Sequence, residues 1–252
     1  MTPRSAATLL LAAVLLAPSA APADDSAVSS AGENQFNMGL EHLRLGRLDL
    51  ALESFQAAIK ENGKNPYFYK GLGVTYLRLR KVDEAISAFR KALELNPYYV
   101  DVRNDLGSAL LLAGKREDGR KELLAAFNDP TNPSPEQTAR NLGQAYLDEK
   151  NYSQALTWFQ TSAQKDPKYA MAYLGLGDTY VAMGRLDDAV RELETATKAM
   201  PEDLSLTSAL GQVYYRAGRF GEARPLLEQV AAKDPAGVEG RRAADLLRRF
   251  PK

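Results

Sequence analysis

The chain has no cysteine, one histidine and one tryptophan among its 252 residues. The lack of cysteine excludes disulfide bonds, thiolate catalysis, cysteine-ligated zinc and a lipid attached to cysteine. Lysine plus arginine and aspartate plus glutamate each total 32, so no net charge attracts nucleic acid or an anionic membrane. We therefore expect no nucleic-acid partner. The composition, 45% hydrophobic and 25% charged, is that of a folded protein.

The N-terminus has the three parts of a secretory signal peptide. Arg4 precedes an uncharged apolar run from Thr8 to Ala17, and the Ala-Pro-Ala sequence at residues 21–23 is a cleavage site. The apolar run is well short of the roughly 20 residues that cross a bilayer, which argues against a retained anchor. We expect residues 1–23 to be removed, residues 24–32 to form a flexible leader, and the mature protein to be soluble in the periplasm.

From residue 33 onward the sequence repeats itself. Six glycines recur at spacings of 34, 34, 36, 34 and 34 residues: Gly39, Gly73, Gly107, Gly143, Gly177 and Gly211. A leucine or methionine precedes each glycine, and a bulky residue follows sixteen positions later: Phe55, Phe89, Leu123, Phe159, Leu193 and Leu227. A period of this length is typical of arrays of helical repeats.

Each unit is predicted to be a pair of antiparallel helices. Glycine and alanine let two helices approach closely, while bulky side chains fill the space beside them. The doublets Gly71/Gly73 and Gly175/Gly177 are therefore predicted to be packing glycines rather than parts of a nucleotide-binding loop. Most units end with a proline, which cannot continue a helix: Pro97, Pro167, Pro201 and Pro235.

This pattern resembles the tetratricopeptide repeat, whose consensus is W-x2-L-G-x2-Y, A-x3-F and P. The resemblance implies an all-α fold, a right-handed α-solenoid of six helical hairpins. Since one hairpin cannot bury its apolar face alone, residues 238–252 are expected to form a C-terminal capping helix and tail. The array is predicted to span residues 33–237, in repeats of about 32–65, 66–99, 100–133, 136–169, 170–203 and 204–237 with an insertion at 134–135.

The segment "NDPTNPSP", residues 128–135, carries the insertion, and we call it the junction. Its prolines are expected to stop the second helix of the third repeat and to leave Ser134, Pro135 and Glu136 to begin the next helix. Two interpretations stay open. The junction is either a tolerated longer turn or a recognition element.

The organisation of the whole chain resembles the pilotin family that assembles the type IV pilus secretin. The resemblance lies in six repeats behind a secretory signal, with a proline-rich expansion at the third junction followed by "NLGQAYL". Members of that family are lipoproteins, whereas this chain has no lipobox cysteine. The resemblance implies a role in pilus biogenesis, with an outer-membrane secretin as the partner.

No residue pattern indicates catalysis. His42 occupies the position that is tyrosine in four other repeats, so it is expected to pack between helices. The adjacent Asp187 and Asp188 mark a helix start and lack the spacing of metal ligands. We predict that the protein is not an enzyme and that it has no catalytic residue, cofactor or metal.

The remaining route to function is a binding surface. In the tetratricopeptide repeat family, the first helices of successive repeats line a concave groove. The family's groove positions fall here on a mixed polar and aromatic set: Phe36, Tyr67, Lys70, Arg78, Asn104, Arg140, Gln144, Asp178, Gln212, Tyr215 and Arg216. This lining suits an extended peptide or a helix, so we predict a protein partner and no small-molecule substrate.

Two functions follow from these observations. The first is a non-enzymatic scaffold for protein–protein interaction in the bacterial cell envelope, in its narrower form a type IV pilus or secretin assembly factor. The alternative is an accessory subunit of an envelope enzyme or of a polysaccharide export complex. The sequence does not name the partner, because the fold does not dictate which exposed side chains line the groove.

Overall fold

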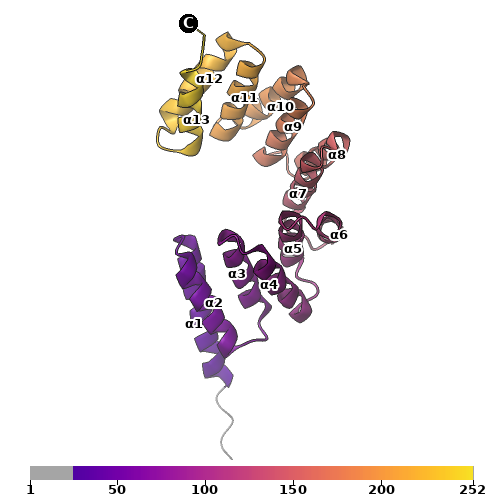
Figure 1. Ribbon diagram of the computed structural model, residues 1–252, viewed down its shortest axis with the longest axis vertical. Coiled ribbons are helices and arrows are strands. Elements are labelled where there is room, and N and C mark those ends of the chain that lie inside the picture. The colour runs from indigo at the N-terminus through magenta and orange to yellow at the C-terminus, as the bar shows by residue number, and fades with distance from the viewer. Residues whose placement is uncertain (1–24, 252) are drawn as a thin grey trace, which may run out of the picture.

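The computed structural model describes residues 25–251, which contain thirteen α-helices and no strand (Figure 1). The prediction of an all-α fold is confirmed. The predicted signal peptide, residues 1–23, lies outside the described residues. The helices are α1 Asp25–Arg44, α2 Leu48–Glu61, α3 Pro66–Arg78, α4 Val82–Leu95, α5 Val100–Leu112, α6 Arg116–Phe127, α7 Pro135–Asp148, α8 Tyr152–Lys165, α9 Ala170–Ala182, α10 Leu186–Ala199, α11 Leu204–Arg216, α12 Phe220–Lys233 and α13 Val238–Leu247.

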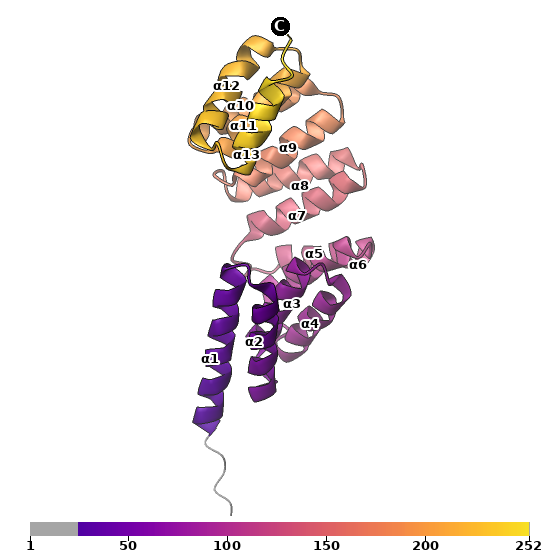
Figure 2. The same ribbon diagram turned by 60° about the vertical axis from the view of Figure 1, so that its left-hand side comes forward.

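The helices pair in chain order and stack into one array. α1 packs on α2, α3 on α4, and so on to α11 on α12, while each second helix also contacts the first helix of the next pair. The first helices also touch one another along the array, from α1 and α3 to α9 and α11. In Figure 1 the stack forms an arc that opens to the left, with α6 and α8 on its outer side; Figure 2 shows the same succession from another side.

The repeat glycines are packing glycines, as predicted. A Cβ atom on Gly39 would lie 2.7 Å from the ring of Phe55, and one on Gly71 would lie 2.5 Å from the same ring. Phe55 is fully buried, so its ring fills the space between its own hairpin and the next. Phe159 of α8 has the same place between the fourth and fifth hairpins. Each such ring links two neighbouring hairpins.

The beginning of α1 differs from the sequence prediction. Residues 24–32 were expected to form a flexible leader, but α1 is helical from Asp25 onward. The segment contains no proline to stop a helix. Gly32 is buried, and a Cβ atom there would lie 3.4 Å from both Glu61 and Phe68. The packed part of α1 therefore includes the end of the expected leader.

The C-terminal end of the array is covered by α13, which packs against α11 and α12 (Figure 1). Phe250, just beyond α13, has its ring centroid 5.0 Å from that of Tyr215 and 5.6 Å from that of Phe220. This aromatic group fastens the chain end to the last hairpin. Within residues 25–251, no helix combines the length and the apolar character needed to cross a membrane.

Candidate binding groove

Three hollows lie along the first helices of the array. The junction hollow is lined by α3, α5, the junction and α7; the middle hollow by α5 and α7; and the C-terminal hollow mainly by α9, α11 and α13. Their volumes are about 200, 230 and 210 Å³. Seven of the eleven predicted groove residues line these hollows: Lys70, Asn104, Arg140, Gln144, Asp178, Gln212 and Arg216.

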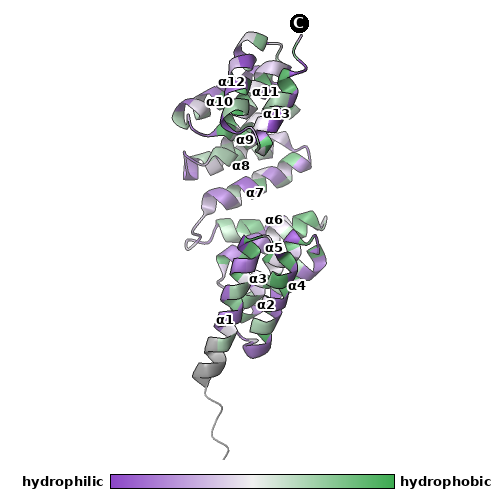
Figure 3. Ribbon diagram, turned by 90° about the vertical axis from the view of Figure 1, so that its left-hand side faces the viewer, coloured by the Kyte–Doolittle hydropathy of each residue, from purple (hydrophilic) through white to green (hydrophobic). Residues whose placement is uncertain are grey.

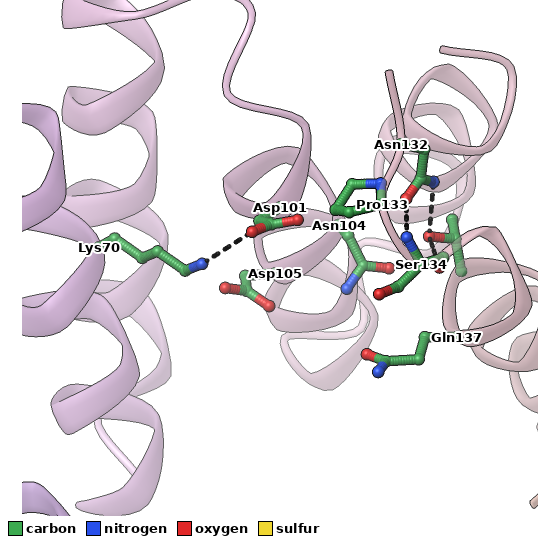
Figure 4. A pocket seen from close by; sticks show the side chains of 9 residues that line it. Lys70, Asp101, Asn104, Asp105, Asn132, Pro133, Ser134 and Gln137 are labelled. Atoms are coloured by element: carbon green, nitrogen blue, oxygen red, sulfur yellow. Dashed lines mark hydrogen bonds and ion pairs between the residues drawn. The ribbon is translucent and has the colours of Figure 1, made fainter. Parts of the chain in front are cut away.

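The junction hollow has an almost wholly polar lining, formed by Lys70, Asp101, Asn104, Asp105, Asn132, Pro133, Ser134, Gln137 and Thr138. Figure 4 shows Lys70 reaching from α3 toward the two aspartates of α5, with the junction and Gln137 of α7 on the other side. The Lys70 ammonium nitrogen lies 3.2 Å from the Asp101 carboxylate and 5.2 Å from the centroid of the Tyr99 ring. The positive charge of Lys70 is therefore already paired with Asp101 of α5.

Asp105 differs from Asp101 in having no cationic partner. Among residues 25–251, its carboxylate forms no ion pair. Burial raises the pKa of Asp105 to about 6; the nearby Lys70 acts in the opposite direction and Asp101 adds to the rise. A hydrogen bond from the Asn104 side chain also lowers the pKa of Asp105, so at neutral pH the junction hollow contains a partly buried, ionised carboxylate that lacks an ion pair.

The junction is a folded turn that ties α6 to α7. The Ser134 amide donates a hydrogen bond to Asn132 Oδ1 at 2.9 Å. Asn132 Nδ2 donates in turn to the Ala126 carbonyl at 2.8 Å and to the Thr138 hydroxyl at 3.1 Å. α7 begins at Pro135 with Ser134 before it, as predicted. These bonds fix the wall of the junction hollow.

The middle hollow contains Arg140 and Gln144 and lies where α5 faces α7. Asn141 Nδ2 donates to Asn104 Oδ1 at 3.1 Å and to the Ser108 hydroxyl at 3.3 Å, so the contact between the two helices is polar here. Figure 3 colours much of α7 as hydrophilic. The middle of the groove therefore combines these hydrogen-bonding groups with the apolar side chains of Leu111, Leu112 and Ala145.

The C-terminal hollow combines charged and apolar side chains. Asp178, Gln212 and Arg216 line it together with Arg242 of α13 and an apolar wall of Met171, Leu174, Val181 and Val213. Burial raises the pKa of Asp178, while the nearby Arg216 and Arg242 lower it. Arg242 Nη1 donates to Glu239 at 3.0 Å. This hollow can take an amphipathic segment of a partner.

The other four predicted groove residues lie outside the three hollows. Phe36 packs against two core phenylalanines, with ring centroids 5.7 and 5.1 Å away. Arg78 donates to a carbonyl in the last turn of α1 at 2.6 Å, and the Tyr215 hydroxyl donates to a carbonyl beyond α13 at 3.2 Å. Tyr67 is 54% exposed. The Tyr67 ring meets that of Tyr99 edge-on, with centroids 5.2 Å apart. All four side chains thus make contacts between neighbouring elements.

Sequence reasoning missed Asp105, although a signal was present. Asp105 is the sixth residue of its repeat. In the other repeats this position holds small or amide residues: Asn37, Gly71, Asn141, Gly175 and Ala209. A charged residue at a position otherwise kept small or neutral does not serve helix packing, and comparison of the six repeats column by column would have identified it.

The described residues include no group of three or more His, Cys, Asp or Glu side chains placed to hold a metal ion. His42 is half-buried on α1, and its Nδ1 atom is buried without a hydrogen bond. Both observations concern residues 25–251 only.

Models of known protein families match most of the chain, and the matching models are of one kind. Two models, both described as tetratricopeptide repeat, match the chain, one over residues 36–100 and the other over residues 78–137, 146–213 and 187–249. None of the curated proteins matches the chain in sequence.

Solved structures have the same fold. PilW, described as a widely conserved type IV pilus biogenesis factor, is 20% identical with a TM-score of 0.71, over 84% of this chain and 98% of its own. The pilF protein of Pseudomonas aeruginosa is 18% identical with a TM-score of 0.67, over 86% and 97%. YrrB, described as having an unusual peptide-binding site, is 22% identical with a TM-score of 0.52, over 73% and 98%. The predicted resemblance to pilus proteins is confirmed as a likeness of fold.

Proposed function

The chain belongs to the tetratricopeptide repeat family, and we propose that it is a non-enzymatic scaffold that holds a protein partner in the bacterial cell envelope. The observation that carries the proposal is the succession of three hollows along the first helices. Groups presented by packed helices are already in place before binding, which lowers the entropy cost of association. An extended peptide or a helix can occupy successive hollows, as in other groove-binding proteins.

The narrower proposal is a role in type IV pilus biogenesis, with a segment of an outer-membrane secretin in the groove. Two observations support it. The likeness of fold extends over 98% of PilW and 97% of pilF. The junction follows the third repeat, where the resemblance to pilotins places a proline-rich expansion. Without a lipobox cysteine, the protein acts in the periplasm rather than from a lipid anchor.

Photo-cross-linking in living cells tests the scaffold proposal. We expect benzoylphenylalanine in place of Gln144, in the middle hollow, to trap one predominant protein partner. The same probe in place of Gln160, an exposed residue on the second helix of the same repeat, is the matched control and is expected to trap little. Both variants replace a glutamine in one hairpin, so a difference between them reports the groove and not the fold.

Mass spectrometry of the Gln144 adduct decides between the forms of the proposal. A secretin in the adduct supports the pilus role. An envelope enzyme or a polysaccharide export protein supports the accessory-subunit alternative and overturns the pilus role. Equal trapping by the two positions would contradict binding in the groove.

Cell fractionation tests the location. We expect the protein in the periplasmic fraction, with Asp24 as its first residue, because the apolar run is too short for a stable anchor and is followed by a cleavage site. N-terminal sequencing identifies the cleavage point. Recovery in membranes after a high-salt wash, with Met1 retained, would contradict this location. The groove proposal would not be affected, because the cross-linking experiment tests it separately.

A further inference from the structure

The lining of the junction hollow is negatively charged. It contains one lysine and two aspartates, and its other residues are neutral, so its formal charge is −1 when both aspartates are ionised. Lys70 is bound to Asp101 and lies over the Tyr99 ring. Among residues 25–251 Asp105 forms no ion pair and is favoured in its charged form only by the nearby Lys70 and by Asn104, so the excess negative charge of the lining lies at Asp105.

An unpaired carboxylate in a protected hollow is costly for the fold. Packing does not require it, because the same position in neighbouring repeats holds Gly71 and Asn141. A cation that enters the hollow would offset the cost, since opposite charges attract more strongly where water is partly excluded. The charge of Asp105 is thus better explained by a ligand than by stability.

The neighbouring groups favour a guanidinium as that cation. A guanidinium has five N–H donors in one plane and no acceptor, so it fits among carboxylate and amide oxygens. Asp105 of α5 and Gln137 of α7 supply such oxygens from two helices, and Figure 4 shows both side chains at the hollow.

We propose that the junction hollow is the subsite for an arginine side chain of the bound partner, with Asp105 as its charge partner. The proposal rests on the proposed function, because the arginine belongs to the segment held in the groove. It also chooses between the two interpretations of the junction. Asn132, Pro133 and Ser134 close the hollow, so the insertion is a recognition element rather than a lengthened turn.

Titration of the protein with a defined probe tests this subsite. The probe is an acetylated and amidated pentapeptide with arginine between two pairs of glycines, and the control peptide has citrulline, a neutral analogue of arginine. In ¹H–¹⁵N spectra, we expect the arginine peptide to cause saturable shifts in α5 and the junction, and the citrulline peptide to cause none. Equal shifts from the two peptides, or shifts confined to the other hollows, would overturn the proposal.

The variant Asp105→Asn isolates the charge with little change of shape. We expect this variant to bind the arginine peptide at least tenfold more weakly, a loss of about 1.4 kcal/mol of binding free energy. Asp187→Asn, which removes an exposed carboxylate from α10 outside the three hollows, is the matched control and is expected to leave the affinity unchanged. Unchanged affinity in Asp105→Asn would contradict the assignment.

The pH dependence gives an independent readout. Because the pKa of Asp105 is raised to about 6, the ionised form that binds arginine is present above that pH and is lost as the pH falls through it. Lys70 and Asp101 are the other charged groups that face Asp105. We expect the affinity of the arginine peptide to fall between about pH 7.5 and about pH 5 in the natural protein and to stay constant in Asp105→Asn.

Stability measurements separate binding from folding. A raised carboxyl pKa means that Asp105 favours the folded state at low pH and that this contribution is lost as the pH rises through about 6. Asp105→Asn is therefore expected to be at least as stable as the natural protein at neutral pH. If the probe at position 144 still traps a partner while the arginine peptide fails to bind, the arginine subsite is wrong and the scaffold proposal stands. If the peptide binds but the probe at position 144 traps nothing, the hollow binds arginine and the scaffold proposal is wrong.

Discussion

Replacing Gly175 with leucine is expected to lower the free energy of unfolding by about 3 kcal/mol. A Cβ atom at this position would lie 2.3 Å from Cε1 and 2.4 Å from Cδ1 of Phe159, far inside contact distance. Phe159 is fully buried and also lies against Gly143, so its ring has no free space to move into. The gain in helix propensity on replacing glycine, about 1 kcal/mol at most, is smaller. Urea denaturation followed by circular dichroism measures the difference.

Gly221→Leu is the matched control, because Gly221 is exposed on α12 and a Cβ atom there would meet nothing within 4 Å. Its stability is expected to stay the same or to rise by at most about 1 kcal/mol, the gain in helix propensity. Combining Gly175→Ala with Phe159→Leu should cost at least about 1 kcal/mol less than the sum of the two single changes, because they share one contact. A Gly175→Leu protein as stable as the natural one would mean that the fourth and fifth hairpins do not pack through this ring.

The same contact explains why the fold could be predicted from the sequence. Each close approach of two hairpins joins a small residue to a bulky one at a fixed separation in the sequence. The repeat period therefore predicts the tertiary contact. Helix ends are equally local. Pro97 follows Asn96, the residue that caps α4, and Pro135 lies in the first turn of α7. Such features depend only on residues close in the chain.

The tightness of each contact could not be predicted in this way. The sequence predicts Gly175 and Gly177 alike to be packing glycines, yet a Cβ atom on Gly177 would lie 3.0 Å from Leu193, compared with 2.3 Å between one on Gly175 and Phe159. Gly175 faces the ring of the preceding hairpin, whereas Gly177 faces a leucine of its own hairpin. Which neighbour a position faces depends on how the hairpins stack.

The residues that line the candidate groove could be predicted only in part, for a related reason. The junction hollow joins Lys70, Asp105 and Gln137 from three successive hairpins, and only the curvature of the array brings them together. At the two ends of the array, Phe36 and Tyr215 occupy groove positions but pack against other aromatic rings. A terminal hairpin lacks a neighbour on one side, so its groove positions are used to cover the end.

The contact between the third and fourth hairpins, which we call the seam, relies on polar groups. Arg120 of α6 forms ion pairs with Glu149, the residue that follows α7, and with Glu117 of its own helix, and its guanidinium lies 5.4 Å from the centroid of the Tyr146 ring. The Asn141 bonds to α5 complete the seam on the groove side. The junction hollow and the middle hollow both span the seam, so binding in the groove depends on its remaining closed.

Replacing Arg120 with methionine is expected to lower the free energy of unfolding by about 2 kcal/mol. The Arg120 and Glu149 side chains are 13% and 21% exposed, so removal of one leaves a largely desolvated charge, although Arg116, 3.9 Å from Glu149, compensates in part.

Trp158, the only tryptophan, packs edge-on to Phe127 of α6 with ring centroids 5.1 Å apart, so its fluorescence reports the seam. We expect the fluorescence of the variant to change at lower urea than its circular dichroism, because repeats can separate locally. Arg44→Met, at an exposed pair with Glu41 in α1, is the control and should cost no more than about 0.5 kcal/mol. Coincident transitions at the natural midpoint in Arg120→Met would show that apolar contacts alone hold the seam.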